Sequence, residues 1–245
     1  MLERRGRMST SFERRPVAVI AGAGPGNGQA IARRFAESGY VVVLLGRNAE
    51  KTQDLAKEIP QAVGYGCDVS DSDEVSSVFS QIRSDLGEVD VLVFNAGSAI
   101  FADIETVTAE QFEASWRVNA LGGLLCSQAV IPEMVARGAG HILFIGATAS
   151  RRGGAQMAAF APAKAAQRSL AESMARQLWP KGVHVALIII DGIVDTPATR
   201  AYVPDRPVES LVAPDAVAHT AYELTRQDRR GWSFEVEVRP FLEKW

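Results

Sequence analysis

The stretch from Val17 to Ser38 reads VAVIAGAGPGNGQAIARRFAES and decides the fold. Its first five residues form a short apolar run typical of a buried strand, and Gln29–Ser38 carries apolar residues at helical spacing. The glycine turn Gly22–Gly28 stands between them. Glycines let backbone N–H groups approach a phosphate, and the start of the following helix is partially positive. This unit predicts a dinucleotide site, although glycine-rich turns also serve simply to reverse the chain.

The rest of the chain alternates short apolar runs with longer segments of helical spacing. Runs without polar alternation are typical of strands buried on both faces of a parallel sheet. Alternating strands and helices with short connections then give a doubly wound α/β sheet of the Rossmann type, in a single domain. Near the end, Phe234–Val238 alternates apolar and acidic residues and predicts a final edge strand. The remaining predicted strands are Val41–Leu45, Ala62–Cys67, Val91–Phe94, His141–Ile145 and Val183–Ile190.

Two segments depart from this rhythm. The first fifteen residues hold five arginines and no apolar stretch, so we expect residues 1–15 to form a mobile arm ahead of a domain over 16–245. Asp191–Val212 contains three prolines and no strong periodicity. Ligands of open α/β sheets bind at the carboxyl edge of the strands, where this segment must begin, so it is predicted to be a substrate-covering loop.

Composition excludes several classes of function. The 245 residues include 26 Lys and Arg against 29 Asp and Glu, a formal net charge of −3, which does not favour binding to nucleic acid or to a membrane surface. The most apolar run, Val183–Ile190, is far shorter than the roughly 18 residues of a membrane span. Cys67 and Cys126 are isolated, which indicates free thiols in a reducing compartment. We therefore expect a soluble, cytoplasmic protein.

From about Val17 to Val238 the chain resembles the short-chain dehydrogenase/reductase family. The family's motifs occur in its order, although Ala21 replaces a Thr before the glycine turn and Asp191 replaces a Pro. The resemblance implies a nicotinamide dinucleotide cofactor. The residues that it assigns to cofactor binding are Gly22, Gly26 and Gly28 of the turn, the adenine-side pair Asp68 and Val69, the motif Asn95, Ala96 and Gly97 after the fourth strand, and Thr196.

The end of the second strand bears on the choice of cofactor. A carboxylate there would bind the adenosine ribose and select NAD. Gly46 stands at that position, and Arg47 follows with a guanidinium suited to a 2′-phosphate. We therefore predict a preference for NADP(H) over NAD(H), with Arg47 as a binding residue, against the alternative of a solvated loop arginine. Pro25 leaves the glycine turn without a second basic residue, so the expected preference is modest.

The resemblance also implies catalytic roles that this chain fills only in part. In the family a Tyr gives a proton to the substrate oxygen. A Lys four residues on lowers its pKa and holds the nicotinamide ribose, a Ser orients the substrate, and an Asn anchors a relay water. Lys164 and Asn119 match the Lys and the Asn, whereas Phe160 occupies the Tyr position and Ala147 the Ser position. In a shifted register, Thr148 or Ser150 can supply the missing hydroxyl.

Three hypotheses follow for a chain without these two groups. General acid catalysis contributes roughly 10²–10⁴-fold, so ordinary ketone reduction is predicted to be weak or absent. In the first hypothesis, hydride goes to a small molecule that needs no proton at the reacting atom, such as an iminium ion or an activated alkene. In the second, Asp191 serves as the acid. In the third, the protein binds the dinucleotide without catalysis, as a sensor or a structural subunit.

Assembly and metal binding complete the sequence-based expectations. The segment Ala155–Trp179 is rich in alanine and is predicted to be helical. In the family, the corresponding helices pair across a subunit interface, so the resemblance implies a homodimer or a homotetramer. His141, His184 and His219 show no metal-ligand spacing, so no metal site is expected.

Overall fold

The computed structural model describes residues 14–243 and contains a seven-stranded parallel sheet in the order β3-β2-β1-β4-β5-β6-β7. The sheet confirms the doubly wound α/β fold and the predicted edge strand. Its strands are β1 (Val17–Ala21), β2 (Val41–Gly46), β3 (Ala62–Gly66), β4 (Val91–Phe94), β5 (Gly140–Ala147), β6 (Val183–Ile190) and β7 (Glu235–Val238).

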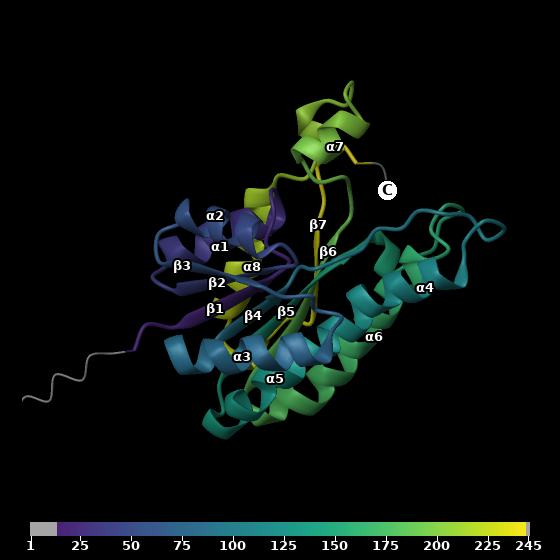
Figure 1. Cartoon of the computed structure of the whole chain (residues 1–245). Coiled ribbons are helices and arrows are strands. Elements are labelled where there is room, and N and C mark those ends of the chain that lie inside the picture. Colours follow the sequence, from purple (N-terminus) through teal and green to yellow (C-terminus); the bar gives the residue numbers. More distant parts are fainter. Residues whose placement is uncertain (1–13, 244–245) are drawn as a thin grey trace, which may run out of the picture.

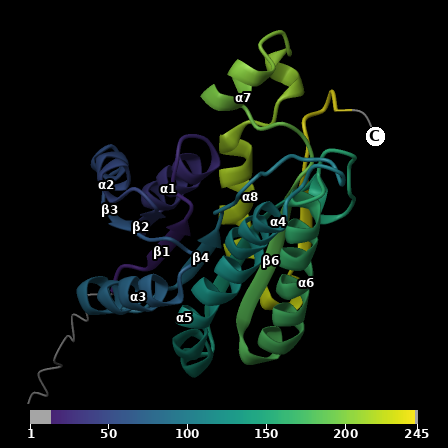
Figure 2. The ribbon, with the colours of Figure 1, turned by 45° about the vertical axis from the view of Figure 1, so that its right-hand side comes forward.

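Helices cover both faces of the sheet (Figures 1 and 2). One face is covered by α3 (Ser72–Leu86), α5 (Gly122–Arg137) and α6 (Phe160–Leu178). The other face is covered by α1 (Asn27–Glu37), α2 (Ala49–Lys57) and α8 (Pro214–Arg226). On each face, the apolar side chains of the helices and of the sheet form a separate buried cluster.

The start of the domain is held at the amino-terminal edge of the sheet. Residues 1–13 of the predicted mobile arm lie outside the described residues. Arg14 donates to both carboxylate oxygens of Asp90 at 2.9 Å, and Arg15 donates to the side chain of Gln61 at 2.7 Å. Asp90 also accepts the backbone N–H of Val17 at 2.7 Å. Arg14 and Arg15, the described residues of the predicted arm, therefore contact the domain.

The segment predicted to be a loop contains a short helix. Within Asp191–Val212, α7 (Pro197–Tyr202) stands above the carboxyl edge of the sheet (Figure 1). Thr196 accepts the Thr199 N–H through its side chain, and Pro197 occupies the first helical position. Both features favour a helix start, and they outweigh the weak periodicity of the segment.

Two other helices differ from the sequence-based expectation. The helix predicted from Ala155 begins only at Phe160, because Met157 pairs with Ala102 in an isolated β-bridge. The helix α4 (Ala109–Trp116), a π-helical turn at Arg117–Leu121 and α5 form one continuous stretch of 29 residues.

By length and composition alone, the stretch Ala109–Arg137 could cross a membrane. Its apolar side chains have a role inside the fold. Cys126, Val130 and Met134 are buried in the cluster beneath the sheet, and α5 lies beside α3. The composition of a core helix thus accounts for its apolar character.

Two histidines face each other at the amino-terminal edge, far from the carboxyl ends of the strands. His141 in β5 and His184 in β6 are register partners, with ring centroids 5.8 Å apart, and His184 stacks on Trp232 at 4.7 Å. Burial lowers the pKa of His141 to about 4, and the charges of His184, Arg229 and Arg137 act in the same direction. The folded state therefore favours neutral imidazole.

This burial predicts a loss of stability in mild acid. An unfolded histidine takes up a proton near pH 6.5, whereas folded His141 does not until about pH 4. The free energy of unfolding should therefore fall as the pH drops from 6.5 towards 4, by about 2 kcal/mol at pH 5 for one such group. Urea unfolding at pH 7 and pH 5 measures this difference. His141→Leu should remove at least half of the loss, and His219→Gln, at an exposed site in α8, should leave it in place. An equal pH effect in both variants contradicts the assignment.

Candidate functional site

A cavity of about 740 Å³ runs along the carboxyl ends of the first strands. It extends from the glycine turn over the end of β2 to the segment after β4. This volume lies within the range of small-molecule and cofactor sites. Most of the predicted cofactor residues line it, namely Gly22, Arg47, Asp68, Val69, Asn95, Ala96 and Gly97.

The glycine turn is seated against the end of β4. Gly22 has φ +92°, and a Cβ atom there would lie 2.4 Å from the backbone nitrogen of Ala96. The Asn95 side-chain amide donates to the Gly22 carbonyl at 2.7 Å. A Cβ atom on Gly28 would lie 2.5 Å from that same carbonyl oxygen. These close approaches need glycine, and they leave the backbone of the turn open to a ligand at the start of α1.

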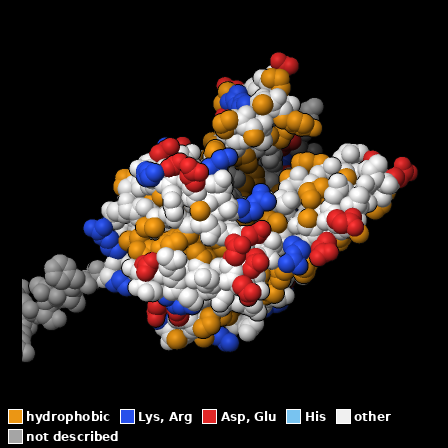
Figure 3. Space-filling model, in the orientation of Figure 1, with side chains coloured by type: hydrophobic (Ala, Val, Ile, Leu, Met, Phe, Trp, Pro, Cys, Tyr) orange, Lys and Arg blue, Asp and Glu red, His pale blue; other side chains and the backbone are white. Residues whose placement is uncertain are grey.

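Gly26 and Thr196 meet where the α7 segment crosses the glycine turn. Gly26 has φ +100°, and a Cβ atom on it would lie 2.5 Å from the Thr196 Cγ2 atom. The structure thus brings two predicted cofactor residues together, although neither lines the cavity itself. The surface is hollowed beneath the lobe that carries α7, with hydrophobic side chains on part of its walls (Figure 3).

At the end of β2 the cavity wall carries two cations. Arg47 and Lys51 both line it, and neither side chain forms a hydrogen bond or ion pair within residues 14–243. A Cβ atom on Gly46 would lie 2.7 Å from the Thr52 hydroxyl oxygen, so a side chain at position 46 would require Thr52 to move. Sequence analysis missed Lys51. The signal was its place in the first turn of the helix that follows β2 and Arg47.

Carboxylates on the same wall are already engaged. Asp54 accepts from Lys57 at 2.7 Å, and Glu58 lies 3.5 Å from Arg33. Burial acts to raise the pKa of Asp68. The Ser70 hydroxyl and N–H, which both donate to its carboxylate, together with Arg47 and Arg117, hold that pKa below its usual value. Asp68 is thus an anion next to the free cations.

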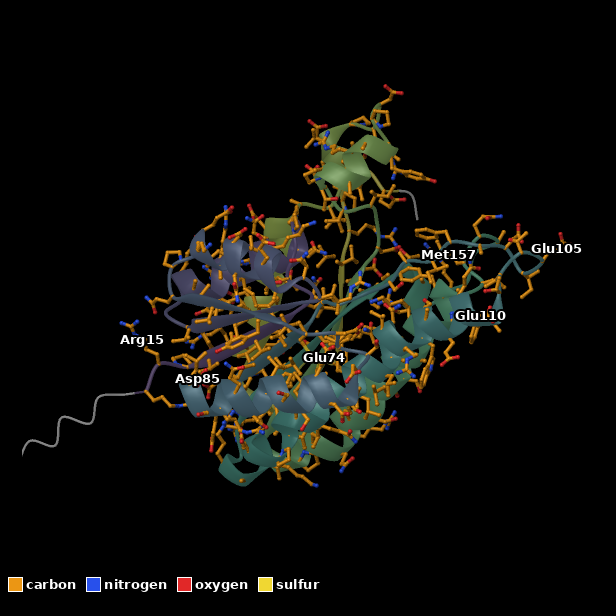
Figure 4. The ribbon with its side chains drawn as sticks, in the orientation of Figure 1. Arg15, Glu74, Asp85, Glu105, Glu110 and Met157 are labelled. Carbon is orange, nitrogen blue, oxygen red and sulfur yellow. The ribbon has the colours of Figure 1, made fainter. Side chains whose placement is uncertain are left out.

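Glu74 closes the far side of this region. It lies at the beginning of α3, near the carboxyl ends of the strands (Figure 4), and its carboxylate accepts the Asp68 backbone N–H at 2.7 Å. Asp71 caps the same helix by accepting the N–H groups of Asp73 and Glu74. These bonds fix the backbone of the Asp68–Val69 pair.

Lys164 and Asn119 are buried behind Gly97. The Lys164 ammonium donates to the Ile145 carbonyl at 2.8 Å and to the Gln167 side chain at 3.1 Å. Burial lowers the pKa of Lys164 to about 8. A Cβ atom on Gly97 would lie 3.3 Å from Asn119 Oδ1 and 3.9 Å from Lys164 Nζ. The two residues that the sequence analysis matched to the family's catalytic Lys and Asn therefore converge beside the last residue of the Asn95–Gly97 motif.

Asn119 projects from the π-helical turn and is completely buried. Its amide nitrogen donates to the carbonyls of Ser98 at 3.0 Å and Ser115 at 2.8 Å. Its Oδ1 atom has no hydrogen-bond partner among the described residues. An unpartnered buried oxygen, a glycine cradle and a long cavity together fit a dinucleotide with its associated water.

No proton donor stands at the Tyr and Ser positions. The Phe160 ring packs against the Phe101 ring, with centroids 5.7 Å apart. Met157, labelled in Figure 4, lies just before α6 and pairs with Ala102 of the loop after β4. At the end of β5, Ala147 presents only a methyl group, and its N–H donates to the Ser150 hydroxyl at 3.2 Å. Ser150 itself is buried.

Thr148 and Asp191, the other candidates, are bound to each other. The Thr148 hydroxyl donates to the Asp191 carboxylate, which is buried and forms an ion pair with Arg239. Arg152 lies 3.6 Å from the same carboxylate, and the Asp191 N–H donates to the Val238 carbonyl at 2.9 Å. The Asp191 carboxylate is therefore already bound by the Thr148 hydroxyl and by Arg239, with Arg152 close by.

From Asp191, ion pairs continue along β7. Arg239 contacts Glu237 at 3.0 Å, and Glu237 pairs with Arg151. Arg151 also contacts Glu235 at 2.8 Å, and Glu235 accepts from Arg168 in α6 at 2.6 Å. The Arg151 guanidinium is thus bound to the two glutamates of the edge strand β7. Among residues 14–243 no cluster of His, Cys, Asp and Glu is arranged to hold a metal ion.

Comparison with known proteins agrees with this geometry. A Staphylococcus aureus (strain USA300) protein named as an uncharacterized oxidoreductase is 31% identical over 227 residues, which is 91% of this chain and 96% of that protein. A metagenomic short-chain oxidoreductase solved with NADP is 31% identical, with a TM-score of 0.80 over 93% of this chain and 98% of that one. A gluconate 5-dehydrogenase from Burkholderia cenocepacia, solved with NADP and tartrate, is 27% identical, with a TM-score of 0.84 over 93% and 94%.

The family model described as short chain dehydrogenase matches residues 16–207. That match spans β1 to β6, the glycine turn, Asn119, Lys164 and α7, and ends before β7. The chain therefore belongs to the short-chain dehydrogenase family.

Proposed function

We propose that this protein is an NADP(H)-dependent oxidoreductase that transfers hydride to a substrate needing no enzymic proton at the reacting atom. An iminium ion or an activated alkene is such a substrate. The observation that carries the proposal is the contrast within one site. The residues for the dinucleotide are in place, whereas Phe160 and Ala147 remove both groups that would serve a carbonyl oxygen.

The preference for NADP(H) rests on the free charges at the end of β2. Arg47 can bind a 2′-phosphate through two N–H groups, and Lys51 adds a second cation on the same wall. The nearby acids Asp54 and Glu58 are paired with other residues and do not neutralise them. In two structural relatives described above, the bound dinucleotide is NADP.

Removing either cation should weaken NADP⁺ binding and leave NAD⁺ binding unchanged. A hydrogen bond to a charged group contributes about 1.5–3 kcal/mol, so Arg47→Ala and Lys51→Ala should each raise the Kd for NADP⁺ by roughly ten- to a hundredfold. Titration by intrinsic tryptophan fluorescence measures both dinucleotides. Lys181→Ala, at an exposed site that does not line the cavity, is the control and should bind like the parent. Equal Kd values for NADP⁺ and NAD⁺ in the parent would contradict the proposed preference for NADP(H).

The residues beside the nicotinamide end support positioning without acid catalysis. Lys164 would hold the nicotinamide ribose of a bound cofactor and add positive charge, and Gly97, which has no side chain, would leave room for the ring. A bound NADPH supplies hydride at its C4 atom. Thr148 cannot give its proton to a substrate while Asp191 accepts it. The site therefore supports the reaction by positioning the cofactor and the substrate and by the positive charge of Lys164.

Hydride transfer to C=N⁺ is balanced without a proton. The hydride forms a C–H bond, the π electrons return to nitrogen, and the cation becomes a neutral amine. With an activated alkene, hydride adds to the β-carbon, and the resulting enolate takes its proton from solvent. A ketone instead develops an alkoxide, which this site cannot protonate.

NADPH consumption against cyclic iminium ions, α,β-unsaturated carbonyls and simple ketones tests the proposal. Turnover of one of the first two classes, with ketones far slower, is the expected result. Binding of NADPH with no turnover on any class favours the alternative, a dinucleotide-binding protein without catalysis, for which the Phe101–Phe160 ring contact at the Tyr position is the supporting observation.

Restoring the two missing groups should restore ketone reduction. Phe160→Tyr adds one oxygen a helical turn before Lys164, whose charge favours ionisation of the new phenol. Ala147→Ser adds the hydroxyl that orients a carbonyl. The double variant should reduce simple ketones at least about 10²-fold faster than the parent.

The gain in the double variant should also depend on Asn119. Adding Asn119→Ala should abolish it, because the relay is then incomplete. Phe112→Tyr, at an exposed site in α4, is the matched control and should give no gain. A double variant that folds and binds NADPH but reduces no ketone contradicts the idea that Phe160 and Ala147 alone prevent ketone reduction.

A further inference from the structure

Gln167 is a polar residue that neither the family motifs nor the proposed chemistry uses, and it is completely buried. It lies three residues after Lys164 on α6, on the same face of the helix. Its side-chain oxygen accepts from Lys164 Nζ at 3.1 Å, and its side-chain nitrogen donates to the backbone carbonyl of Asn119 at 3.0 Å. Both ends of a buried amide are therefore satisfied by the two retained residues of the site.

We infer that Gln167 is a positioning residue that links Lys164 to the π-helical turn and fixes the ammonium group as a charged donor beneath the cofactor ribose. The inference rests on the cofactor site of the proposed function. It adds a role for a residue that touches neither dinucleotide nor substrate.

The hydrogen bonds of Lys164 determine which way its ammonium group can donate. Two of the three ammonium protons go to the Ile145 carbonyl and to Gln167, and both acceptors lie on the buried side. The nitrogen is 3.9 Å from the position of a Cβ atom on Gly97, which lines the cavity. The third proton is left for the cavity side. Without the Gln167 oxygen, the long lysine side chain would lose one of the two contacts that set this direction.

The link also affects the charge of Lys164. Burial favours the neutral amine and is the cause of its lowered pKa of about 8, with no charged side chain of the described residues contributing. The acceptors that oppose burial are neutral oxygens, those of Ile145 and Gln167. A hydrogen bond to the ammonium stabilises the charged form. Removing the Gln167 oxygen should therefore lower the pKa, and a carboxylate in its place should raise it.

The test is the pH dependence of NADP⁺ affinity between pH 7 and 9.5, where the 2′-phosphate is already fully ionised. Affinity of the parent should fall as the pH rises through the pKa of Lys164, because the neutral amine donates more weakly. Gln167→Met, of similar size but without an acceptor, should move the midpoint down by about one pH unit. Gln167→Glu should move it up.

Two controls identify the titrating group. Lys164→Met should bind NADP⁺ more weakly with no midpoint in this range. Gln81→Met, at an exposed site in α3, should titrate like the parent. A merely structural role for Gln167 would weaken binding equally at every pH, and an unchanged midpoint in Gln167→Met and Gln167→Glu overturns the inference.

A second measurement does not depend on the cofactor. The ¹³Cε chemical shift of Lys164, followed by NMR in the cofactor-free protein, reports its titration directly. The midpoint of this titration should be lower in Gln167→Met and higher in Gln167→Glu than in the parent. Equal midpoints in both variants overturn the inference, whether or not the protein binds NADP⁺. If the parent fails to bind NADP⁺ while these shifts occur, the proposed cofactor fails and the positioning role of Gln167 stands.

Discussion

The contact between Gly22 and the end of β4 organises the whole carboxyl edge. A methyl group at position 22 would stand 2.4 Å from the Ala96 nitrogen, and the Asn95 amide is bound to the Gly22 carbonyl. The turn after β1 therefore rests directly on the turn after β4, with no side chain between them. Helix α1 consequently starts at the cavity, and the Asn95–Gly97 motif is brought alongside it. Asn119 and Lys164 then converge behind Gly97, so the site depends on this one close approach.

The two halves of the site have different characters. At the end of β2, the side chains of Arg47 and Lys51 form no hydrogen bond or ion pair within residues 14–243, and the nearby Asp54 and Glu58 are paired with other cations. In the half where chemistry would occur, polar groups are bound to one another, as Thr148 is to Asp191 and Lys164 is to Gln167. Free charges suit a ligand that arrives charged. Satisfied polar groups suit a reaction in which the protein exchanges no proton.

Much of the architecture could be predicted from sequence because it depends on local patterns. Every predicted strand is present. The central strands follow from uninterrupted Val, Ile and Leu runs, which fit a sheet buried on both faces, and β7 follows from alternation at an edge. The helix α7 was missed because its start depends on a cap at Thr196 and on Pro197 rather than on periodicity. The partner of Asp191 was missed because Arg239 lies 48 residues away. Such pairs follow from strand order, which motif spacing does not contain.

The aspartate at position 191 ties the end of β6 to the end of β7. Proline there, as the family has it, would remove both the N–H that donates to Val238 and the carboxylate that pairs with Arg239. Arg239, itself largely buried, would lose a partner, and the ion pairs along β7 would lose their first member. A change at position 191 alone would therefore disturb a residue 48 positions further along the chain. The end of β6 and the end of β7 thus behave as one unit, in which neither position can be altered independently of the other.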